Sequence, residues 1–153
     1  MDHLYIQCPI GILHVTVINE VIVKIDLENE IKESTKFELK DKIIQSFEAY
    51  FNGTLLDFDL PYYIEGSTFR KEVLEETKRI PFGETRSYLD LSMKCFNMNK
   101  SRAVGQALNK NPLMILIPCH RVIGKNQSLV GYNGGLELKQ FLLNHEKNVV
   151  KKG

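Results

Sequence analysis

The chain has 153 residues and a formal net charge of +1, with 43% hydrophobic and 25% charged residues. This balance suits one compact domain or two small lobes and excludes disordered and fibrous proteins. No apolar run approaches a membrane span, and the N-terminus lacks a secretory signal, so we expect no membrane partner. Three scattered cysteines form no disulfide framework, which favours a reducing, cytoplasmic setting (nuclear if the source is eukaryotic).

The charges are distributed unevenly along the chain. Residues 1–60 contain five lysines and eleven acidic residues, a net charge of −6. Residues 86–125 contain seven basic residues and one acidic residue, a net charge of +6. A basic segment beside an acidic one indicates a polyanion-binding surface. The alternative is a solvated basic face that binds no partner.

The first part of the chain has the pattern of an antiparallel meander followed by a helix. Three runs rich in β-branched residues predict strands, and Asn19-Glu20 supplies a turn between the last two. Ser34 or Thr35 would cap the helix, and Asn52-Gly53 would end it. The expected strands are residues 4–7, 11–17 and 21–27, the apolar helix face is Leu39, Ile43, Phe47 and Tyr50, and residues 54–66 form an extended linker.

The second part is predicted to be mainly helical. Phe69, Val73 and Thr77 have helical spacing, and Pro81-Phe82-Gly83 ends that element. Residues 87–90 match a capping box, which begins a short helix that extends to about Lys94. A polar turn at residues 97–100 leads to a second short helix, residues 101–109. Two short helices joined by a tight turn predict a helix-turn-helix, which coincides with the basic segment.

A final helix is predicted from residue 136 to about residue 147. Lys139 and Glu146 are seven residues apart within an apolar stripe, so they lie on nearly the same side of this helix. Partly buried charges need partners, although both side chains could instead extend to water at the helix edge.

Cys119 lies at the end of an apolar run, residues 113–117, that we expect to be a buried strand. His120 and Arg121 follow it directly. A thiol is a strong nucleophile only as the thiolate, and nearby positive charge favours that form. The alternative is that Cys119 packs as a small buried hydrophobe.

These elements predict an α+β fold in two domains. Residues 1–64 would form a small antiparallel sheet with one helix, and residues 65–153 a mainly helical domain. The chain resembles the O6-alkylguanine-DNA alkyltransferase (methylated-DNA–protein-cysteine methyltransferase) family, which implies a ribonuclease-H-like first domain and a winged-helix type of helix-turn-helix in the second. The matching blocks are Phe82-Gly83-Glu84 with Ser87-Tyr88, Arg102-Ala103-Val104-Gly105, Asn111-Pro112, Ile117-Pro118-Cys119-His120-Arg121-Val122, Gly131-Tyr132 with Gly134-Gly135-Leu136, Lys139, and Leu142-Leu143 with His145-Glu146.

The resemblance implies a DNA repair activity in which Cys119 accepts the alkyl group of O6-alkylguanine, and possibly of O4-alkylthymine, once per molecule. His120 would act as the base through a water, and Glu146 would orient it. Tyr88 would donate a proton to guanine N3, and Asn111 would tie the recognition helix to the Cys119 segment. No metal or organic cofactor enters this chemistry.

The resemblance also implies how double-stranded DNA is bound. The damaged base must be rotated out of the stack, and Arg102 would intercalate in its place. Ala103 and Gly105 would let the helix approach the minor groove, and a monomer should suffice. Asn97, Lys100 and Lys125 would contact phosphates. Val122, Tyr132, Asn133, Gly134 and Lys139 would line the substrate pocket.

Two positions depart from the family pattern, and one family feature is not expected. Ser92 stands where Ala is common, and Asn133 stands where other small or basic residues occur, which leaves the accepted alkyl size open. Some members hold a structural zinc in the first lobe, but His3, Cys8 and His14 lack tight ligand spacing, so we expect no metal.

Two other functions remain possible from the residues. One is a non-catalytic protein that binds alkylated DNA, or a regulator, on the same scaffold. The other is a cysteine hydrolase that uses Cys119 and His120, although adjacent Cys and His rarely form a direct nucleophile–base pair.

Overall fold

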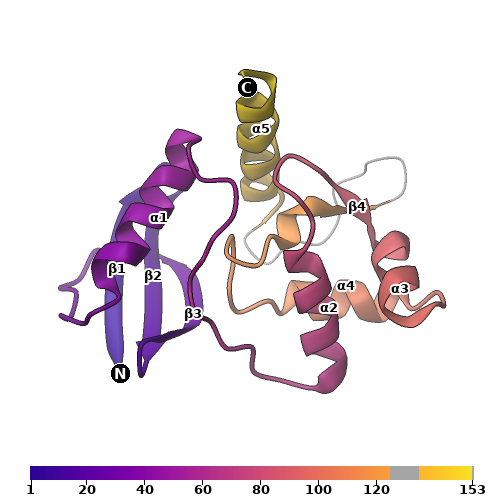
Figure 1. Ribbon diagram of the computed structural model, residues 1–153, viewed down its shortest axis with the longest axis horizontal. Helices are drawn as coiled ribbons and strands as arrows, with labels where there is room; N and C mark the ends of the chain where they lie inside the picture. Colours follow the sequence, from indigo (N-terminus) through magenta and orange to yellow (C-terminus); the bar gives the residue numbers. More distant parts are fainter. Residues whose placement is uncertain (125–134, 153) are drawn as a thin grey trace. The chain divides into compact units, whose positions relative to one another are not determined.

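A computed structural model of the chain describes residues 1–124 and 135–152 (Figure 1). The chain forms two compact units, Met1–Ile64 and Glu65–Gly153. The first combines a small antiparallel sheet with a helix and the second is mainly helical, so the predicted α+β class is confirmed. Among the described residues, no helix combines the length and the apolar character needed to cross a membrane.

The sheet of the first unit is the predicted meander. Its strands are β1 (Asp2–Cys8), β2 (Gly11–Ile18) and β3 (Val21–Glu28), paired antiparallel in the order β1-β2-β3. Asn19 and Glu20 both have positive φ, 51° and 61°, as a two-residue hairpin turn requires.

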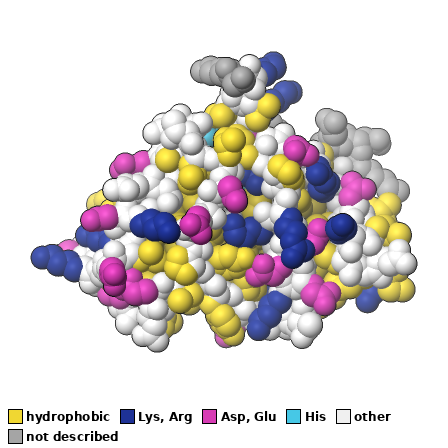
Figure 2. Space-filling view, in the orientation of Figure 1, with side chains coloured by type: hydrophobic (Ala, Val, Ile, Leu, Met, Phe, Trp, Pro, Cys, Tyr) yellow, Lys and Arg dark blue, Asp and Glu magenta, His cyan; other side chains and the backbone are white. Residues whose placement is uncertain are grey.

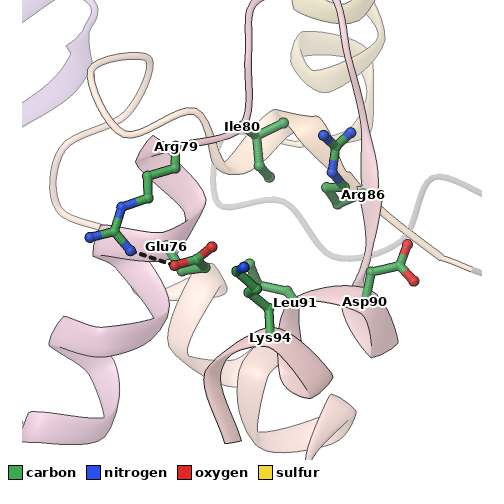
Figure 3. Close-up of a pocket in the computed structure, with 7 residues that line it drawn as sticks. All are labelled: Glu76, Arg79, Ile80, Arg86, Asp90, Leu91 and Lys94. Carbon is green, nitrogen blue, oxygen red and sulfur yellow. Dashed lines mark hydrogen bonds and ion pairs between the residues drawn. The ribbon is translucent and has the colours of Figure 1, made fainter. Parts of the chain in front are cut away.

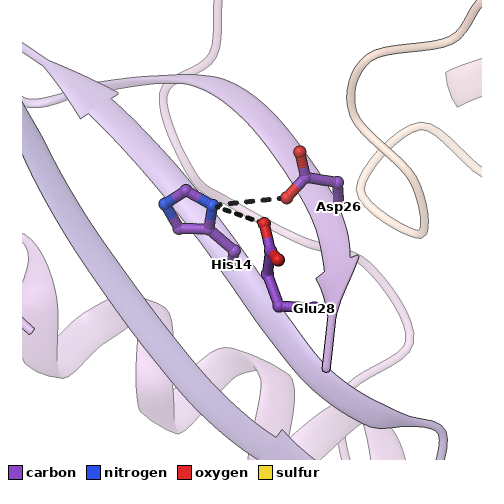
Figure 4. A group of neighbouring side chains, drawn as sticks. All are labelled: His14, Asp26 and Glu28. Carbon is purple, nitrogen blue, oxygen red and sulfur yellow. Dashed lines mark ion pairs between the residues drawn. The ribbon is translucent and has the colours of Figure 1, made fainter. Parts of the chain in front are cut away.

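Side chains alternate across the strands, so Leu13 and Val15 are buried while His14 lies on the opposite face. There His14 Nδ1 is 3.4 Å from Asp26 Oδ1 and 3.5 Å from Glu28 Oε1, both on β3 (Figure 4).

Helix α1 (Lys40–Asn52) buries Ile43, Phe47 and Tyr50, and Gly53 ends it at a φ of 85°. The predicted cap at Ser34 or Thr35 is wrong. These hydroxyls accept hydrogen bonds from the backbone N–H groups of Tyr5 and His3 instead, at 3.0 and 2.9 Å, because β1 is an edge strand with unpaired donors. The N-cap residue is Leu39, whose N–H donates to the Glu20 carboxylate at 2.7 Å.

The predicted linker is attached to the sheet edge for part of its length. Ile22 of β3 donates its N–H to Pro61 O, and Tyr63 donates its N–H to Ile22 O, both at 3.0 Å. Tyr62 thereby forms a parallel bridge with Ile22. The end of the first unit is therefore held by backbone hydrogen bonds rather than by packing alone.

Four α-helices form most of the described part of the second unit. The capping box at Ser87 and Asp90 is present, and the predicted short helix pair is confirmed. Helix α5 extends five residues beyond its expected end, and Val150 in that extra turn lies against Gly83. The helices are α2 (Thr68–Lys78), α3 (Tyr88–Phe96), α4 (Ser101–Asn109) and α5 (Leu136–Lys152).

Two short strands bring the start of α3 beside the segment that follows Cys119. They are β4 (Arg86–Ser87) and β5 (Val122–Ile123), which pair in parallel. Because Ser87 caps α3, this pairing positions Tyr88 close to the 3₁₀ turn Cys119–Arg121.

The expected strand at residues 113–117 is wrong. The segment is a buried tight turn in which Leu116 N–H donates to Met114 O and Ile117 N–H donates to Leu113 O, at 2.8 and 2.9 Å. Ile115 has a φ of 70°, a strained conformation for a β-branched residue. An apolar run reports burial, and burial is equally compatible with a strand and with an enclosed turn.

Candidate active site around Cys119

Cys119 begins the 3₁₀ turn, and its side chain is only 4% exposed. Asn111, which is also buried, donates from Nδ2 to Cys119 Sγ at 3.2 Å and to Ile117 O at 3.0 Å. The Asn111 Oδ1 accepts the N–H of Leu113 at 2.9 Å. One amide therefore holds both ends of the buried turn and directs a donor at the sulfur, which favours the thiolate.

Glu146 on α5 is a buried carboxylate with several donors. It accepts from His120 Nε2 at 2.6 Å, from Arg121 Nε at 2.8 Å and from the N–H of Gly83 at 3.1 Å. Burial raises the pKa of Glu146, but the hydrogen bonds from His120 and Arg121 and the positive charge of Arg121 outweigh it, so the net pKa lies well below the usual range. Glu146 is therefore ionised at neutral pH.

His120 is fully buried, and burial lowers its pKa even though Glu146 opposes that shift. The imidazole is consequently neutral at pH 7, with its proton on Nε2 facing the carboxylate. No described residue makes a hydrogen bond to Nδ1 of His120. The unprotonated Nδ1 is thus available as a proton acceptor, the arrangement of a base oriented by a carboxylate.

Tyr88 and Lys139 lie close together and are electrostatically coupled to Cys119. The Lys139 Nζ is 5.7 Å from the centroid of the Tyr88 ring. Burial, followed by negative charge at Cys119, raises the pKa of Tyr88 to about 12. Burial lowers the pKa of Lys139 to about 8, against the opposing effect of negative charge at Cys119. A protonated Lys139 therefore stabilises a Cys119 thiolate, and Tyr88 keeps its proton.

Arg121 is a site residue for which the sequence offered no individual role. It donates to Glu146 through Nε and Nη2 and to Ile80 O through Nη1, and its guanidinium lies 5.5 Å from the Phe82 ring centroid. The sequence did contain a signal for this role. A partly buried acid in the final helix needs a cation as its partner, and the Cys119 motif contains an arginine.

The described residues predicted to bind DNA lie on α4 or in the turn that precedes it. Arg102 is exposed in the first turn of α4, and a Cβ on Gly105 would lie 3.7 Å from the Tyr88 ring, so Gly105 packs against α3. Asn97 ends α3 with a φ of 55°, and Lys100 Nζ lies 5.0 Å from the Phe96 ring centroid. Ala103 is half-buried, Val122 is buried in β5, and Lys125, Tyr132, Asn133 and Gly134 lie outside the described residues.

Ser92 also has a structural explanation. Its buried hydroxyl donates to Met98 O at 2.7 Å and accepts the N–H of Lys100 at 2.6 Å. The serine therefore holds the turn between α3 and α4, so this departure from the family pattern concerns the helix pair and not the pocket.

The described residues of the second unit line two pockets, among others. One of about 420 Å³ has mixed charge and contains none of the predicted site residues (Figure 3); its lining is Glu76, Arg79, Ile80, Arg86, Asp90, Leu91 and Lys94. The other, also about 420 Å³, includes Glu146 and Gly83 in its wall. Figure 2 shows basic and acidic side chains interspersed among the described residues in view.

Comparisons with known proteins give a consistent result. Residues 1–64 match the 6-O-methylguanine DNA methyltransferase, ribonuclease-like domain, and residues 68–148 match the DNA binding domain of the same family. A methylated-DNA–protein-cysteine methyltransferase of Methanosarcina acetivorans is 43% identical over 128 residues, covering 77% of this chain and 82% of that protein. One of Haemophilus influenzae is 38% identical over 151 residues, covering 94% and 84%. The crystal structure of Mycobacterium tuberculosis OGT in complex with DNA has 34% identity and a TM-score of 0.86, covering 95% and 92%.

Proposed function

The chain belongs to the 6-O-methylguanine DNA methyltransferase family, and from this premise we propose that it moves an alkyl group from O6 of guanine in DNA to its own Cys119. The observation that carries the proposal is the arrangement of a thiol with a directed donor next to a neutral imidazole oriented by Glu146. Methylated-DNA–protein-cysteine methyltransferase is the name of relatives that match most of the chain.

The proposed reaction is a displacement at the alkyl carbon. The Cys119 proton passes through a bridging water to Nδ1 of His120, and Glu146 stabilises the imidazolium that forms. The sulfur lone pair then forms the S–C bond while the C–O6 bond breaks, and its electron pair moves onto the guanine. Tyr88 donates a proton to guanine N3, which makes the departing base a better leaving group. Burial and negative charge at Cys119 raise the pKa of Tyr88, so the phenol is protonated before transfer, as a proton donor must be.

The product on the protein is a stable thioether. We therefore propose a single turnover per molecule, without a metal or organic cofactor in the chemistry. O4-alkylthymine presents an equivalent alkyl–oxygen bond and is a second candidate substrate.

Access to Cys119 requires the damaged base to leave the duplex. A thiol that is 4% exposed cannot reach an O6-alkyl carbon inside stacked DNA, so the nucleotide must rotate into the site. Arg102 is exposed in the first turn of α4 and would fill the gap. The nucleophile, the base and this helix all belong to one unit of one chain, which supports action as a monomer.

The test is to incubate the protein with duplex DNA that contains O6-methylguanine and to measure its intact mass. We expect the addition of one methyl group, which peptide mapping places on Cys119. A Cys119→Ser variant should bind the DNA and gain no mass. Cys95→Ser, which removes another free thiol, should react like the unmodified protein.

The outcomes separate this proposal from the alternatives. Stable binding to alkylated DNA without any gain in mass would indicate a non-catalytic damage-binding or regulatory protein. Repeated turnover on an ester or amide, dependent on Cys119, would indicate a hydrolase. Either result would overturn the alkyl transfer.

A further inference from the structure

Arg121 takes part in no step of the proposed transfer, although it contacts the same carboxylate as His120. The side chains of Arg121 and Glu146 are 8% and 1% exposed, and that of His120 is fully buried. Water therefore screens the charges of this group only weakly, and each charge acts strongly on its neighbours. A fixed positive charge at this place must affect the imidazole.

The guanidinium and the imidazole share one carboxylate oxygen. Arg121 donates through Nε to Oε1 of Glu146 at 2.8 Å and through Nη2 to Oε2 at 3.1 Å. His120 donates through Nε2 to the same Oε2 at 2.6 Å. Because the two donors converge on Oε2, the guanidinium already matches the carboxylate charge that would otherwise attract an imidazolium.

The segment that follows α2 holds this arrangement in place. Ile80 O accepts from Arg121 Nη1 at 2.6 Å, and the centroid of the Phe82 ring lies 5.5 Å from the guanidinium. The N–H of Gly83 donates to Oε1 of Glu146 at 3.1 Å. Both members of the ion pair are therefore fixed by contacts other than their own, so the charge of Arg121 stays at the carboxylate.

The net charge of the group explains the effect of Arg121 on His120. Arg121 and Glu146 together have no net charge, so a proton taken from solvent would make the buried group positive. A proton taken from Cys119 leaves an anion behind, so this transfer creates no net charge. Burial lowers the pKa of His120, and the charges of Arg121 and Lys139 lower it further, against the hydrogen bond and charge of Glu146. The site therefore favours proton transfer from the thiol over proton uptake from water.

We propose that Arg121 is a positioning residue that acts through Glu146: its charge keeps the resting imidazole neutral, so that His120 Nδ1 can accept the Cys119 proton at neutral pH. The inference rests on the proposed function, in which His120 is the base. In that step the S–H bond breaks, the proton passes through the bridging water to Nδ1, and the electron pair of the bond stays on sulfur. Without the guanidinium, the carboxylate would hold a proton on the resting imidazole, and less of the protein would be ready to react.

Two substitutions of Arg121 separate its charge from its packing. Arg121→Lys keeps the charge and loses the planar fork, whereas Arg121→Gln keeps a hydrogen-bond donor and loses the charge. The rate with free O6-benzylguanine is measured from about pH 5 to about pH 8. We expect the rate of Arg121→Gln to fall on the acid side about one pH unit higher than that of the unmodified protein, and Arg121→Lys to follow the unmodified protein. Arg79→Gln removes an arginine whose side chain is 73% exposed and should leave the pH profile unchanged.

A measurement without substrate separates this proposal from the proposed function. The ¹⁵N NMR signals of the His120 ring, assigned by their loss in His120→Gln, report the charge of the imidazole in the resting protein. They should show the imidazolium form at higher pH in Arg121→Gln than in Arg121→Lys. If this shift appears in a protein that gains no methyl mass, the alkyl transfer fails and the effect of Arg121 on His120 stands.

Equal acid-side midpoints for Arg121→Gln and Arg121→Lys would overturn the proposal. So would a rate that Arg121→Gln lowers by the same factor at every pH, because that result indicates a structural role alone. If circular dichroism shows that Arg121→Gln does not fold, the rate of Arg121→Lys decides, since this variant keeps the charge. A rate within about threefold of the unmodified protein then supports the proposal, and a lower rate overturns it.

Discussion

Nε2 of His120 lies 2.6 Å from Oε2 of Glu146, 26 residues away in the chain, and both side chains are almost completely buried. The two residues belong to different segments, the 3₁₀ turn and α5, so the packing of α5 against this turn creates the pair. The pH dependence of the free energy of unfolding and the basicity of His120 both depend on this contact.

Acid should destabilise the protein through this pair. The folded-state pKa values of His120 and Glu146 both lie below their ordinary values of 6.5 and 4.5. As pH falls past each ordinary value, the unfolded chain takes up a proton that the folded chain resists, so the free energy of unfolding decreases. Urea denaturation from pH 7 to pH 3 should show this loss begin near pH 6.5 and steepen below about pH 4.5.

Replacement of the carboxylate should test the same pair. Glu146→Gln leaves Arg121 buried without its anion, and we expect unfolding to become easier by about 3 kcal/mol at pH 7. The variant should also lose the part of the acid dependence that begins near pH 4.5. Glu137→Gln, on the exposed side of the same helix, should change the free energy of unfolding by no more than about 0.5 kcal/mol. Equal effects of the two variants would contradict the buried pair.

Lys139 should make stability rise with pH in the alkaline range. Its pKa is about 8 in the folded protein against an ordinary value of 10.5, so between these values the unfolded chain binds more protons. Relative to Lys139→Met, the free energy of unfolding of the unmodified protein should increase by on the order of 2 kcal/mol from pH 8 to pH 10. If the difference in the free energy of unfolding between the two proteins stayed constant over this range, folding would not lower the pKa of Lys139.

Asn111→Asp should slow alkyl transfer while keeping the hydrogen bond that the Leu113 N–H donates to residue 111. The carboxylate can still accept the Leu113 N–H, but it cannot donate to Cys119 Sγ and places negative charge beside it. We expect the rate with the free base O6-benzylguanine to fall at least tenfold, about 1.4 kcal/mol in activation free energy. Asn109→Asp, an exposed change of the same kind near the end of α4, should leave the rate unaltered.

Arg102→Ala should separate DNA handling from chemistry. Repair of O6-methylguanine in duplex DNA should slow at least tenfold, because nothing then fills the gap left by the rotated base. Reaction with free O6-benzylguanine should be unaffected, since Arg102 is exposed outside the buried site. Lys110→Ala removes an equal charge just beyond α4 and serves as the control. Equal slowing of both substrates by Arg102→Ala would exclude a role in base extrusion.

Local sequence patterns predicted many of the helices and strands. They failed at two places, where contacts between distant segments decide the structure. Residues 87–90 formed the expected capping box because both partners lie within one turn of chain. Ser34 and Thr35 have equally good capping chemistry, yet their hydroxyls bind the edge of β1, about 30 residues away in sequence. The run before Cys119 is buried as expected but turns on Ile115, since hydrophobicity does not specify backbone direction.

The sequence by itself determined the family, the meander, the helix pair and the order of the residues proposed to react, because each depends on neighbouring residues or on a contiguous motif. Tertiary structure alone decided that Glu146 has both His120 and Arg121 as partners, that Lys139 is a buried cation near Tyr88, and that His14 faces Asp26 and Glu28. The physical reason is that desolvation and strand register act through space: they assign charge states and side-chain distances only when segments distant in the chain are packed together.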